Sequence, residues 1–365
     1  MKVKVLMLLN NLEGGGAERV FVNLANQFFL EGVETAVLVA KRTGIYFEIL
    51  LKDIPVYVLD SSSLREHKVH LKTFFQTHFF THVFTADDIF LAAMVHTRQR
   101  SGLTFRHIHT HHYSSPAFRS LYQLKEDLLL RLIHRRYASK ADKIVAVSKG
   151  SLAWLRKSSG NRLGDALYIY NPVFDDQIYD KSRESFHFPV EVKGKKVLLS
   201  IGRLNTQKDH VTLIKAFFEL IKSVPNSVLF ILGEGEEKIR LLKLIKKYQL
   251  EEYVHLVGFQ QNPFNWIYHC DVFVLSSVNE GLPTVLIEAI ALGKTCVSTD
   301  CPSGPAEILE EGRLGYLARV KDPMDLAGKI KMGLESPIDP DILKAASKQY
   351  HNNFVIKKYL SLISG

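Results

Sequence analysis

The chain has 365 residues, of which 46% are hydrophobic and 23% charged, and its mean hydropathy is near zero. This composition excludes wholesale disorder, a fibre and a coiled coil, and the length suits two domains better than one. The net charge of +9 is uneven, because residues 1–175 hold 23 Lys and Arg against 15 Asp and Glu, and also ten of the 15 histidines. This basic half can meet an anionic partner (lipid, a phosphorylated acceptor or nucleic acid), and a solvated basic surface is an equally good interpretation.

The first 175 residues predict strands that alternate with helices. We interpret the start as a strand over residues 3–9 and not as a secretory signal, because its apolar run is short and no small-residue cleavage site follows. Apolar runs predict further strands at 35–40, 83–85, 143–147 and 166–169, and helical periodicity predicts helices at 17–30, 70–77 and 118–137.

The same alternation restarts after a polar stretch at 171–192. It predicts strands at 196–201, 227–232, 253–257, 272–276 and 295–298, and helices at 210–222, 236–248, 284–291 and 324–333. Such a pattern is typical of βαβ units and of a parallel sheet buried on both faces. We therefore predict an α/β fold of two Rossmann-like, doubly wound domains at 1–175 and 176–345, with a last helix inside 346–365 that can return to the first domain.

Two further classes of protein are excluded by what the sequence lacks. No apolar run approaches the roughly 20 residues that a membrane-spanning helix needs. The three cysteines, Cys270, Cys296 and Cys301, are an odd number without a C-x-x-C pair, so we expect neither a disulfide framework nor a zinc site. This cysteine usage favours a reducing cytosol.

Glycines follow the first predicted strand, at the edge where a parallel sheet binds its ligands. Residues 10–19 read NNLEGGGAER, and glycines between a strand and a helix let backbone N–H groups approach a phosphate or a sugar. The spacing is not G-x-G-x-x-G, since Arg19 stands where the last glycine would be, and it is not a P-loop. The alternative is a flexible turn, and we favour contact with a ligand.

Two cations follow the first strand of the second domain. Gly202 permits a tight exit from that strand, and Arg203 and Lys208 stand five residues apart in a short loop before a helix. The cleft between the two domains is the default active site, and there these cations can clamp a diphosphate, Arg through its planar fork and Lys as a point charge. The alternative is that both are ordinary surface charges.

Two carboxylates flank the start of a later helix. Residues 277–289 read SVNEGLPTVLIEA, with Glu280 in the loop after the strand and Glu288 four residues beyond Thr284, which can begin the helix. The free N–H groups at the helix start favour an anion, and the carboxylates can bind hydroxyls of a sugar or ribose. Glu288 stands in an apolar run where a lone buried carboxylate is costly, so we favour a functional role.

Together these motifs resemble the family-four retaining glycosyltransferases of the GT-B fold. The likeness rests on the spacing of Glu280 and Glu288, on Gly-Arg with a following Lys at 202–208, and on the early Gly-Gly-Ala-Glu-Arg. It runs from the first strand to the last helix, is strongest over residues 196–320 and is weaker over 50–140. Further matching stretches are VS at 147–148, YNP at 170–172, GEG at 233–235, VGF at 257–259 and PSGPAE at 302–307.

The resemblance implies transfer of a sugar from a nucleotide diphosphate sugar to an acceptor hydroxyl, with retained anomeric configuration and without a metal. It assigns Arg203 and Lys208 to the leaving diphosphate, Glu280 to a hydroxyl of the donor sugar and Glu288 to the ribose. Retention needs either a carboxylate nucleophile or attack on the face of the leaving group, and the resemblance favours the latter. The other implied donor contacts are Gly15, Gly16, Gly202, Gly281, Leu282, Pro283 and Thr284, with Gly258 and Phe259 beside the base.

The family also carries a first-domain histidine near the anomeric centre. Residues 106–113 read RHIHTHHY, and the family's Thr-x-His pattern matches residues 110–112, which favours His112. A slip of one or two residues would move this role to His111 or His109. His107, His109 and His111 alternate along a strand and need not converge on one ion, so we expect no metal and no cofactor.

We therefore predict a hexosyltransferase-type enzyme of polysaccharide biosynthesis, in lipopolysaccharide, capsule or exopolysaccharide assembly. It would be cytoplasmic, peripheral on the inner face of the cytoplasmic membrane, and would move a sugar, in this family most often UDP-linked, to a lipid-diphosphate-linked saccharide. The predicted helix at 118–137 mixes leucines with arginines, so it can lie on anionic lipid or bury its apolar side in the core. Asp87 and Asp88 can meet the acceptor or cap a helix.

Two other functions stay open at this point. A nucleotide-sugar epimerase of the same fold would need no acceptor, and a non-catalytic protein would only bind the sugar nucleotide. The basic half holds no nucleic-acid-binding motif, so we predict no nucleic-acid partner. The sequence names neither the donor sugar, the acceptor, the linkage nor the oligomeric state.

Overall fold

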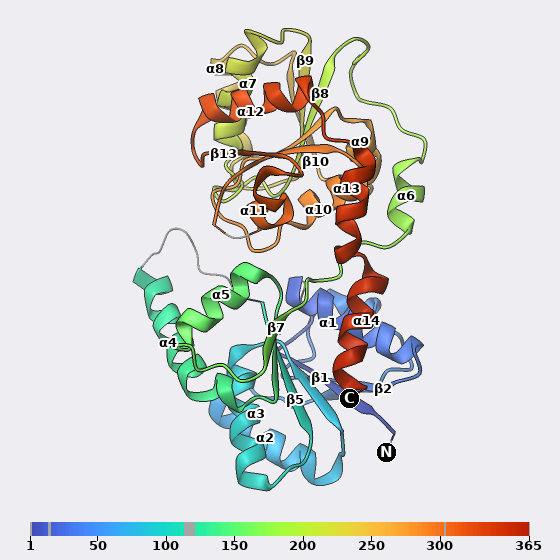
Figure 1. Cartoon of the computed structure of the whole chain (residues 1–365), viewed down its shortest axis with the longest axis vertical. Coiled ribbons are helices and arrows are strands. Elements are labelled where there is room, and N and C mark those ends of the chain that lie inside the picture. Colours follow the sequence, from blue (N-terminus) through green and yellow to red (C-terminus); the bar gives the residue numbers. More distant parts are fainter. Residues whose placement is uncertain (1, 14–15, 113–120, 303, 365) are drawn as a thin grey trace. The chain divides into compact units, whose positions relative to one another are not determined.

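The computed structural model describes residues 2–13, 16–112, 121–302 and 304–364, and Figure 1 traces the chain. The chain forms two compact units, one of residues 1–172 with 353–365 and one of residues 173–352. Residues 346–352 belong to the second unit rather than to a separate last segment. There the Val173 N–H donates to the Tyr350 carbonyl (3.0 Å) and the Asn352 N–H to the Phe174 carbonyl (2.8 Å).

The first unit is built on a parallel seven-stranded sheet of order β3-β2-β1-β4-β5-β6-β7. Its strands are β1 (Lys4–Leu9), β2 (Glu34–Val39), β3 (Val56–Val58), β4 (His82–Thr85), β5 (Arg106–His111), β6 (Lys143–Ala146) and β7 (Ala166–Tyr168). Its helices are α1 (Gly16–Leu30), η1 (Ile45–Glu48), α2 (Leu64–Thr77), α3 (Asp88–Ser101), α4 (Leu121–Tyr137), η2 (Ala138–Lys140), α5 (Lys149–Ser158) and the last helix, α14 (Asn352–Ile363).

Helices cover both faces of this sheet (Figure 1). Val5, Met7 and Leu9 of β1 lie in one buried cluster with side chains of α1 and α14, whereas Leu6 and Leu8 lie in another with side chains of α2 and α3. A third cluster joins α3, α4 and α5 over β6. Because β1 is buried on both faces, it reads as a continuous apolar run, which is why its prediction from the sequence succeeds.

The second unit repeats the design with a parallel six-stranded sheet of order β10-β9-β8-β11-β12-β13. Its strands are β8 (Lys196–Ile201), β9 (Ser227–Leu232), β10 (Val254–Gly258), β11 (Val272–Leu275), β12 (Thr295–Thr299) and β13 (Tyr316–Ala318). Its helices are α6 (Gln177–Ser182), α7 (His210–Ile221), α8 (Lys238–Lys247), α9 (Phe264–His269), α10 (Thr284–Ala291), α11 (Pro305–Ile308), η3 (Glu310–Gly312), α12 (Pro323–Glu335), α13 (Pro340–Ser347) and η4 (Lys348–Tyr350).

The strand order fixes where a ligand can bind in each unit. In both sheets the chain starts in the middle, moves to one edge and then returns to add strands on the other side. The order therefore reverses between β1 and β4 and between β8 and β11. At such a switch point the loops that follow the two strands diverge, and their carboxyl ends form the usual binding crevice of a doubly wound sheet. The prediction of two Rossmann-like, doubly wound α/β domains is confirmed.

Several helices of the structure, among them α3, α5 and short helices such as α6 and α9, are absent from the sequence prediction, as are the short strands β3 and β13. In α3 the residues from Phe90 to Val95 are all buried, so no polar face marks a helical period. The strands β3 and β13 have only three residues each, too few for an apolar run to mark them. The helix predicted at 118–137 is found as α4, and residues 118–120 lie outside the described part of the chain.

Candidate functional site

The two strongest sequence motifs meet at the switch point of the second unit. The loop after β8 carries Gly202, Arg203 and Lys208, and the loop after β11 leads to Glu280. Hydrogen bonds join the two loops. The Val278 N–H donates to the Gln207 carbonyl (2.9 Å), the Gln207 amide donates to the Asn279 carbonyl (2.9 Å), and the Ser276 hydroxyl donates to the Lys208 carbonyl (2.8 Å).

Lys208 and Glu280 form an ion pair at this point. Lys208 Nζ lies 2.6 Å from Glu280 Oε1, and the side chains are 19% and 7% exposed. The Ser277 hydroxyl donates to the same carboxylate oxygen at 2.6 Å, and Thr299 at the end of β12 donates to the Ser277 carbonyl. Because removing one partner of a pair this buried leaves an uncompensated charge, each charge holds the other in place.

The two cations that the sequence groups together have different surroundings. The carbon chain of Lys208 runs along Gly202, where an added Cβ would lie 3.2 Å from three of its carbons. Arg203 is exposed and, within the described residues, forms no ion pair. Lys208 is therefore held by Glu280, while the guanidinium of Arg203 is available to an anion.

α10 adds a positive helix end beside this pair. It begins at Thr284, and the Leu286 N–H is bonded back to the Pro283 carbonyl at 3.1 Å. The N–H groups of the first helical residues have no intrahelical partner, so they favour an anion. Glu288 lies half-buried one turn further along α10. The loop of Gly281, Leu282 and Pro283 thus precedes the helix as predicted, and the sugar and ribose roles of the two carboxylates stay predictions.

A glycine that follows β12 and precedes α11 supports that loop. Gly304 has φ +93°, and an added Cβ would lie 2.7 Å from the Gly281 carbonyl oxygen and 2.6 Å from Pro283. Only glycine fits such a conformation at such a contact. Gly304 is therefore part of what sets the entry into α10.

The end of β10 carries the residues predicted beside the base. Gly258 has φ +84°, and its carbonyl accepts the Gly233 N–H at 2.9 Å, which ties the ends of β9 and β10 together. Phe259, the next residue, is 76% exposed. A large aromatic ring in water at a strand end can stack on a base, and this role stays a prediction.

In the first unit, the three histidines of β5 share one face of the strand, and His112 lies after it. His107, His109 and His111 are buried on the side of α3, α4 and α5, whereas Ile108 belongs to the cluster with α1 and α14. His112 follows the strand on that second side, because its ring meets Phe21 of α1 edge-on at 5.9 Å between centroids. Of the four histidines, His112 is the one that lies toward α1.

The imidazole of His112 is neutral at physiological pH. Withdrawal of the ring from water lowers its pKa to about 3, and the neighbouring His111 acts in the same direction. Within the described residues its Nε2 has no hydrogen-bond partner. Its role at the anomeric centre stays a prediction.

Of the glycine loop, Gly16 begins α1, and Gly15 lies outside the described residues.

The two acidic residues before α3 have separate tasks. Asp87 caps the helix, its carboxylate accepting the Ile89 N–H at 2.6 Å. Asp88 turns into the unit toward the buried histidines of β5. Helix capping therefore explains Asp87, and Asp88 has a different environment.

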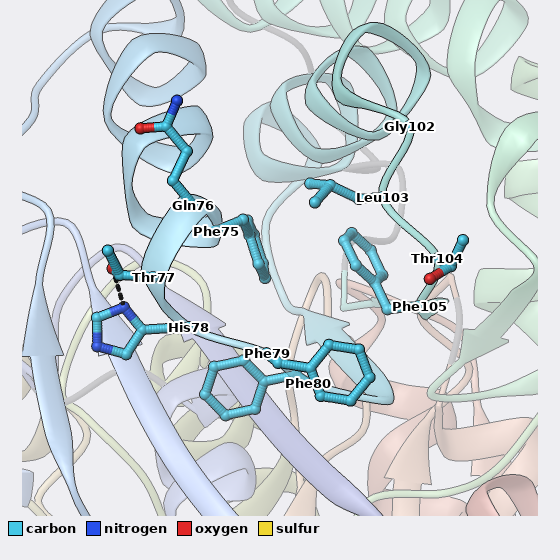
Figure 2. Close-up of a pocket in the computed structure, with 10 residues that line it drawn as sticks. All are labelled: Phe75, Gln76, Thr77, His78, Phe79, Phe80, Gly102, Leu103, Thr104 and Phe105. Carbon is cyan, nitrogen blue, oxygen red and sulfur yellow. Dashed lines mark hydrogen bonds between the residues drawn. The ribbon is translucent and has the colours of Figure 1, made fainter.

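A cavity of about 340 Å³ lies elsewhere in the first unit. Figure 2 shows the rings of Phe75, Phe80 and Phe105 around it, at the end of α2 and the amino ends of β4 and β5. Ligands of doubly wound sheets bind at the carboxyl ends of the strands, so this cavity lies at the edge of the sheet where such ligands do not bind.

Sequence reasoning gave no role to several residues that build the site in the second unit. These residues are buried hydroxyl or thiol side chains at or just after the ends of β11 and β12: Ser276, Ser277, Thr299 and Cys301. Burial raises the pKa of the Cys301 thiol to about 12, so it is neutral beside the ion pair. Polar residues at the ends of the two neighbouring apolar strands β11 and β12 are the sequence feature that could have indicated them.

Two protein-family models account for most of the chain. Residues 14–177 match the model described as Glycosyltransferase Family 4, and residues 182–350 match the model described as Glycosyl transferases group 1. The chain belongs to the family-four glycosyltransferases. The resemblance inferred from the sequence motifs is thereby confirmed, and the two units are the two domains of the GT-B fold of this family.

One relative of this glycosyltransferase is named for a lipid-linked saccharide. It is 36% identical over 209 residues (57% of this chain, 54% of the relative) to the Campylobacter jejuni N-acetylgalactosamine-N,N'-diacetylbacillosaminyl-diphospho-undecaprenol 4-alpha-N-acetylgalactosaminyltransferase. It is 43% identical over 136 residues (36% of this chain, 34% of the relative) to an uncharacterized glycosyltransferase of Methanocaldococcus jannaschii. The matches thus span about half and about a third of these two relatives.

Solved structures agree with this fold. HepE of Anabaena in complex with UDP superimposes with a TM-score of 0.80 at 21% identity, covering 99% of this chain and 100% of that one.

Among the described residues, no helix is both long and apolar enough to cross a membrane.

Proposed function

We propose that this glycosyltransferase moves a sugar from a uridine diphosphate sugar to a hydroxyl of a lipid-diphosphate-linked saccharide, with retention and without a divalent metal. The observation that carries the proposal is the arrangement at the switch point of the second unit. Arg203, the Lys208–Glu280 ion pair and the first turn of α10 all lie there.

Leaving-group stabilisation follows from these charges. As the bond between the sugar and the diphosphate breaks, negative charge grows on the phosphate oxygens. Arg203 supplies a planar fork of N–H donors, and the start of α10 supplies backbone N–H groups. Lys208 has three N–H donors, so it can keep its bond to Glu280 and still donate to a phosphate oxygen. Preorganised donors of this kind do the work that a metal ion does in other enzymes.

Retention follows in this proposal from attack on the face from which the diphosphate departs. The acceptor hydroxyl then lies next to the departing phosphate oxygen. The bond from the anomeric carbon to that oxygen breaks, the bond to the acceptor oxygen forms, and the acceptor proton passes to the phosphate. Glu280 is held by Lys208 and Ser277, which suits it to binding a sugar hydroxyl rather than to attack.

The donor and acceptor classes rest on the relatives. HepE, which shares the fold, is complexed with UDP, and the Campylobacter jejuni relative is an N-acetylgalactosaminyltransferase of a diphospho-undecaprenol saccharide. A uridine diphosphate sugar and a lipid-diphosphate-linked saccharide are the corresponding substrates for this chain. With an acceptor of that kind, we expect the enzyme to work in the cytoplasm, at the inner face of the cytoplasmic membrane.

Membrane contact is supported by the surface of α4. Leu128, Leu129 and Leu132 are 54–60% exposed on this helix, and Arg135 and Arg136 are exposed one turn later. Exposed leucines beside arginines suit the boundary between lipid headgroups and acyl chains, where each cation near an anionic surface contributes about 1 kcal/mol.

Vesicle binding tests this surface. Replacing Leu128, Leu129 and Leu132 together by Ser should release the full chain from phosphatidylglycerol vesicles in a sedimentation assay. The matched control replaces Ile239 and Leu242 by Ser, because these residues are 69% and 50% exposed on the basic helix α8 of the second unit. Equal loss in both variants, or none in the first, would contradict a role for α4.

A donor screen tests the transferase itself. Purified chain is mixed with uridine, guanosine and adenosine diphosphate sugars in buffer without added divalent metal, and melting temperature and release of nucleotide are followed with and without a lipid-diphosphate saccharide. We expect one uridine diphosphate sugar to stabilise the chain and to be consumed only with the acceptor. Isomerisation of the donor without acceptor would indicate an epimerase, and binding without any turnover would indicate a non-catalytic protein.

A further inference from the structure

We propose that Asp88, His111 and His134 form a zinc site inside the first unit, a site that goes beyond the transfer reaction. Asp88 is the first residue of α3, His111 ends β5 and His134 lies in α4. The three potential ligand atoms, Asp88 Oδ1, His111 Nδ1 and His134 Nε2, all lie within 4.8 Å of one another.

The separations suit a single small ion. Asp88 Oδ1 lies 2.9 Å from His134 Nε2 and 3.4 Å from His111 Nδ1. Zinc binds imidazole nitrogen and carboxylate oxygen at about 2.0–2.2 Å with tetrahedral angles, which places two ligand atoms about 3.3 Å apart. An ion among these three atoms therefore needs only small movements of the side chains.

The site is shielded from water. The side chains of His111 and His134 are 1% and 0% exposed, and that of Asp88 is 12% exposed. Trp154 of α5 closes it on one side, because its ring stacks on His111 at 5.4 Å and meets His134 edge-on at 5.4 Å. A buried carboxylate is costly unless its charge is compensated, and a divalent cation would compensate it.

The hydroxyl of Ser158 orients the ring of His134. His134 Nδ1 lies 2.8 Å from Ser158 Oγ, and the single proton of that hydroxyl points at the Leu155 carbonyl, 3.0 Å away, which can only accept. Nδ1 then carries the hydrogen and donates to Ser158. Ser158 thus holds the ring from its Nδ1 side, and the ring turns Nε2, the nitrogen that would bind the ion, toward the Asp88 carboxylate at 2.9 Å.

His109 supplies the outer support that metal ligands usually have. Its Nε2 lies 3.1 Å from Asp88 Oδ1, and its Nδ1 lies 3.0 Å from the hydroxyl of Thr85. With Thr85 donating to Nδ1, the Nε2–H donates to the carboxylate that binds the ion. Ser158 orients His134 in the same way. Partners of this kind fix the orientation of the ligands and raise the affinity for the metal.

The ligand atoms determine which metal ion fits the site. Two imidazole nitrogens and one carboxylate suit zinc, whereas magnesium and calcium prefer sets of oxygen ligands. Three protein ligands leave a fourth position for water. Such an ion would join α3, β5 and α4 just before His112. The leaving-group stabilisation proposed above uses residues of the second unit and no metal, so the ion would have a structural role in the first unit.

Metal analysis of the full chain tests the site. After equilibration with zinc and dialysis, mass spectrometry should find about one zinc ion per chain, and cobalt in its place should give visible absorption bands. Asp88→Asn and His134→Gln should each remove at least about nine-tenths of the bound zinc, since each deletes a direct ligand. His109→Gln should keep the ion with an affinity about tenfold to a hundredfold weaker.

His67→Gln is the matched control. His67 is also a buried histidine of the first unit, bonded to the Ser61 hydroxyl at 2.7 Å, and its variant should keep its full share of zinc. If a ligand variant does not fold, titration of the metal-free wild-type chain against a coloured zinc chelator decides the question. A wild-type chain that takes up no zinc in that titration, or a His134→Gln variant that binds as tightly as the wild type, would overturn the site and leave a hydrogen-bonded cluster.

Discussion

Both units are built on a doubly wound parallel sheet, but their charged residues stand at different places along the chain. In the second unit the charged groups, Arg203, Lys208 and Glu280, stand in loops beyond the strands, where a ligand can reach them. In the first unit His109 and His111 belong to β5 itself and, with Asp88, turn under the covering helices. Whether a polar residue meets a ligand or the interior therefore depends on whether it stands past the strand end or inside the strand.

This difference separates two kinds of mutational effect. Changes in the loops of the second unit should reduce transfer, and changes in the buried cluster of the first unit should reduce stability. Kinetics and unfolding measured on the same variant distinguish the two.

The largest effect should come from the ion pair. Lys208→Ala should lower kcat by about a hundredfold to a thousandfold, because a donor to the leaving diphosphate is lost. It should also lower the free energy of unfolding by about 3–5 kcal/mol, because the buried Glu280 carboxylate loses its partner. Steady-state kinetics and urea unfolding measure the two effects.

A double variant separates these effects. Lys208→Met combined with Glu280→Gln leaves no uncompensated charge, so most of the lost stability should return while transfer stays low. Transfer near the wild-type rate in Lys208→Ala would refute the role of Lys208 at the diphosphate.

A smaller effect should distinguish two histidines of the first unit. His112→Ala should lower kcat by about a hundredfold, as expected for a hydrogen-bonding group next to the reacting atoms. His109→Ala should mainly lower the free energy of unfolding, by about 1–3 kcal/mol, because Asp88 loses a donor inside the unit. Kinetics and urea unfolding of both variants check this order, and a greater loss of transfer in His109→Ala would place the reacting histidine elsewhere.

The smallest effect concerns the pH dependence of stability. Burial lowers the pKa of His210 to about 4, and the charge of Lys208 acts in the same direction, so the folded chain keeps this imidazole neutral. The unfolded chain binds a proton as pH falls below about 6.5. Stability from His210 is therefore complete above pH 6.5 and is lost as pH falls toward 4.

Replacing this histidine should remove that dependence. In His210→Gln, the slope of the unfolding free energy between pH 6.5 and 4.5 should fall by about 1.4 kcal/mol per pH unit. Urea unfolding at several pH values measures it, and parallel curves for variant and wild type would show that the pKa of His210 is the same in the folded and the unfolded chain.

Local patterns explain what the sequence could predict. The motifs around Arg203 and Glu280 each lie within a few residues of a buried apolar strand, so the strand predicts the position and the motif predicts the chemistry. The pairing of Lys208 with Glu280 was not predicted, because it depends on how two loops 72 residues apart meet at the switch point.

The buried cluster of the first unit escaped the sequence for a related reason. The histidines of β5 are visible as a run, but Asp88 and His134 come from α3 and α4 and meet them only when the helices cover the sheet. The apolar stretch from Phe90 to Val95 also hides the period of α3, so its first residue could not be placed on a face.

The most direct test of the donor site is a calorimetric titration of a uridine diphosphate sugar into Arg203→Ala. Arg203 is exposed, so its loss should change the free energy of unfolding by less than about 0.5 kcal/mol. The matched control is Arg240→Ala, an exposed arginine of α8 that pairs with Glu237. Without added divalent metal, donor affinity should fall about tenfold or more in Arg203→Ala and stay unchanged in Arg240→Ala. Equal affinity in Arg203→Ala and the wild type would contradict a diphosphate site at the end of β8.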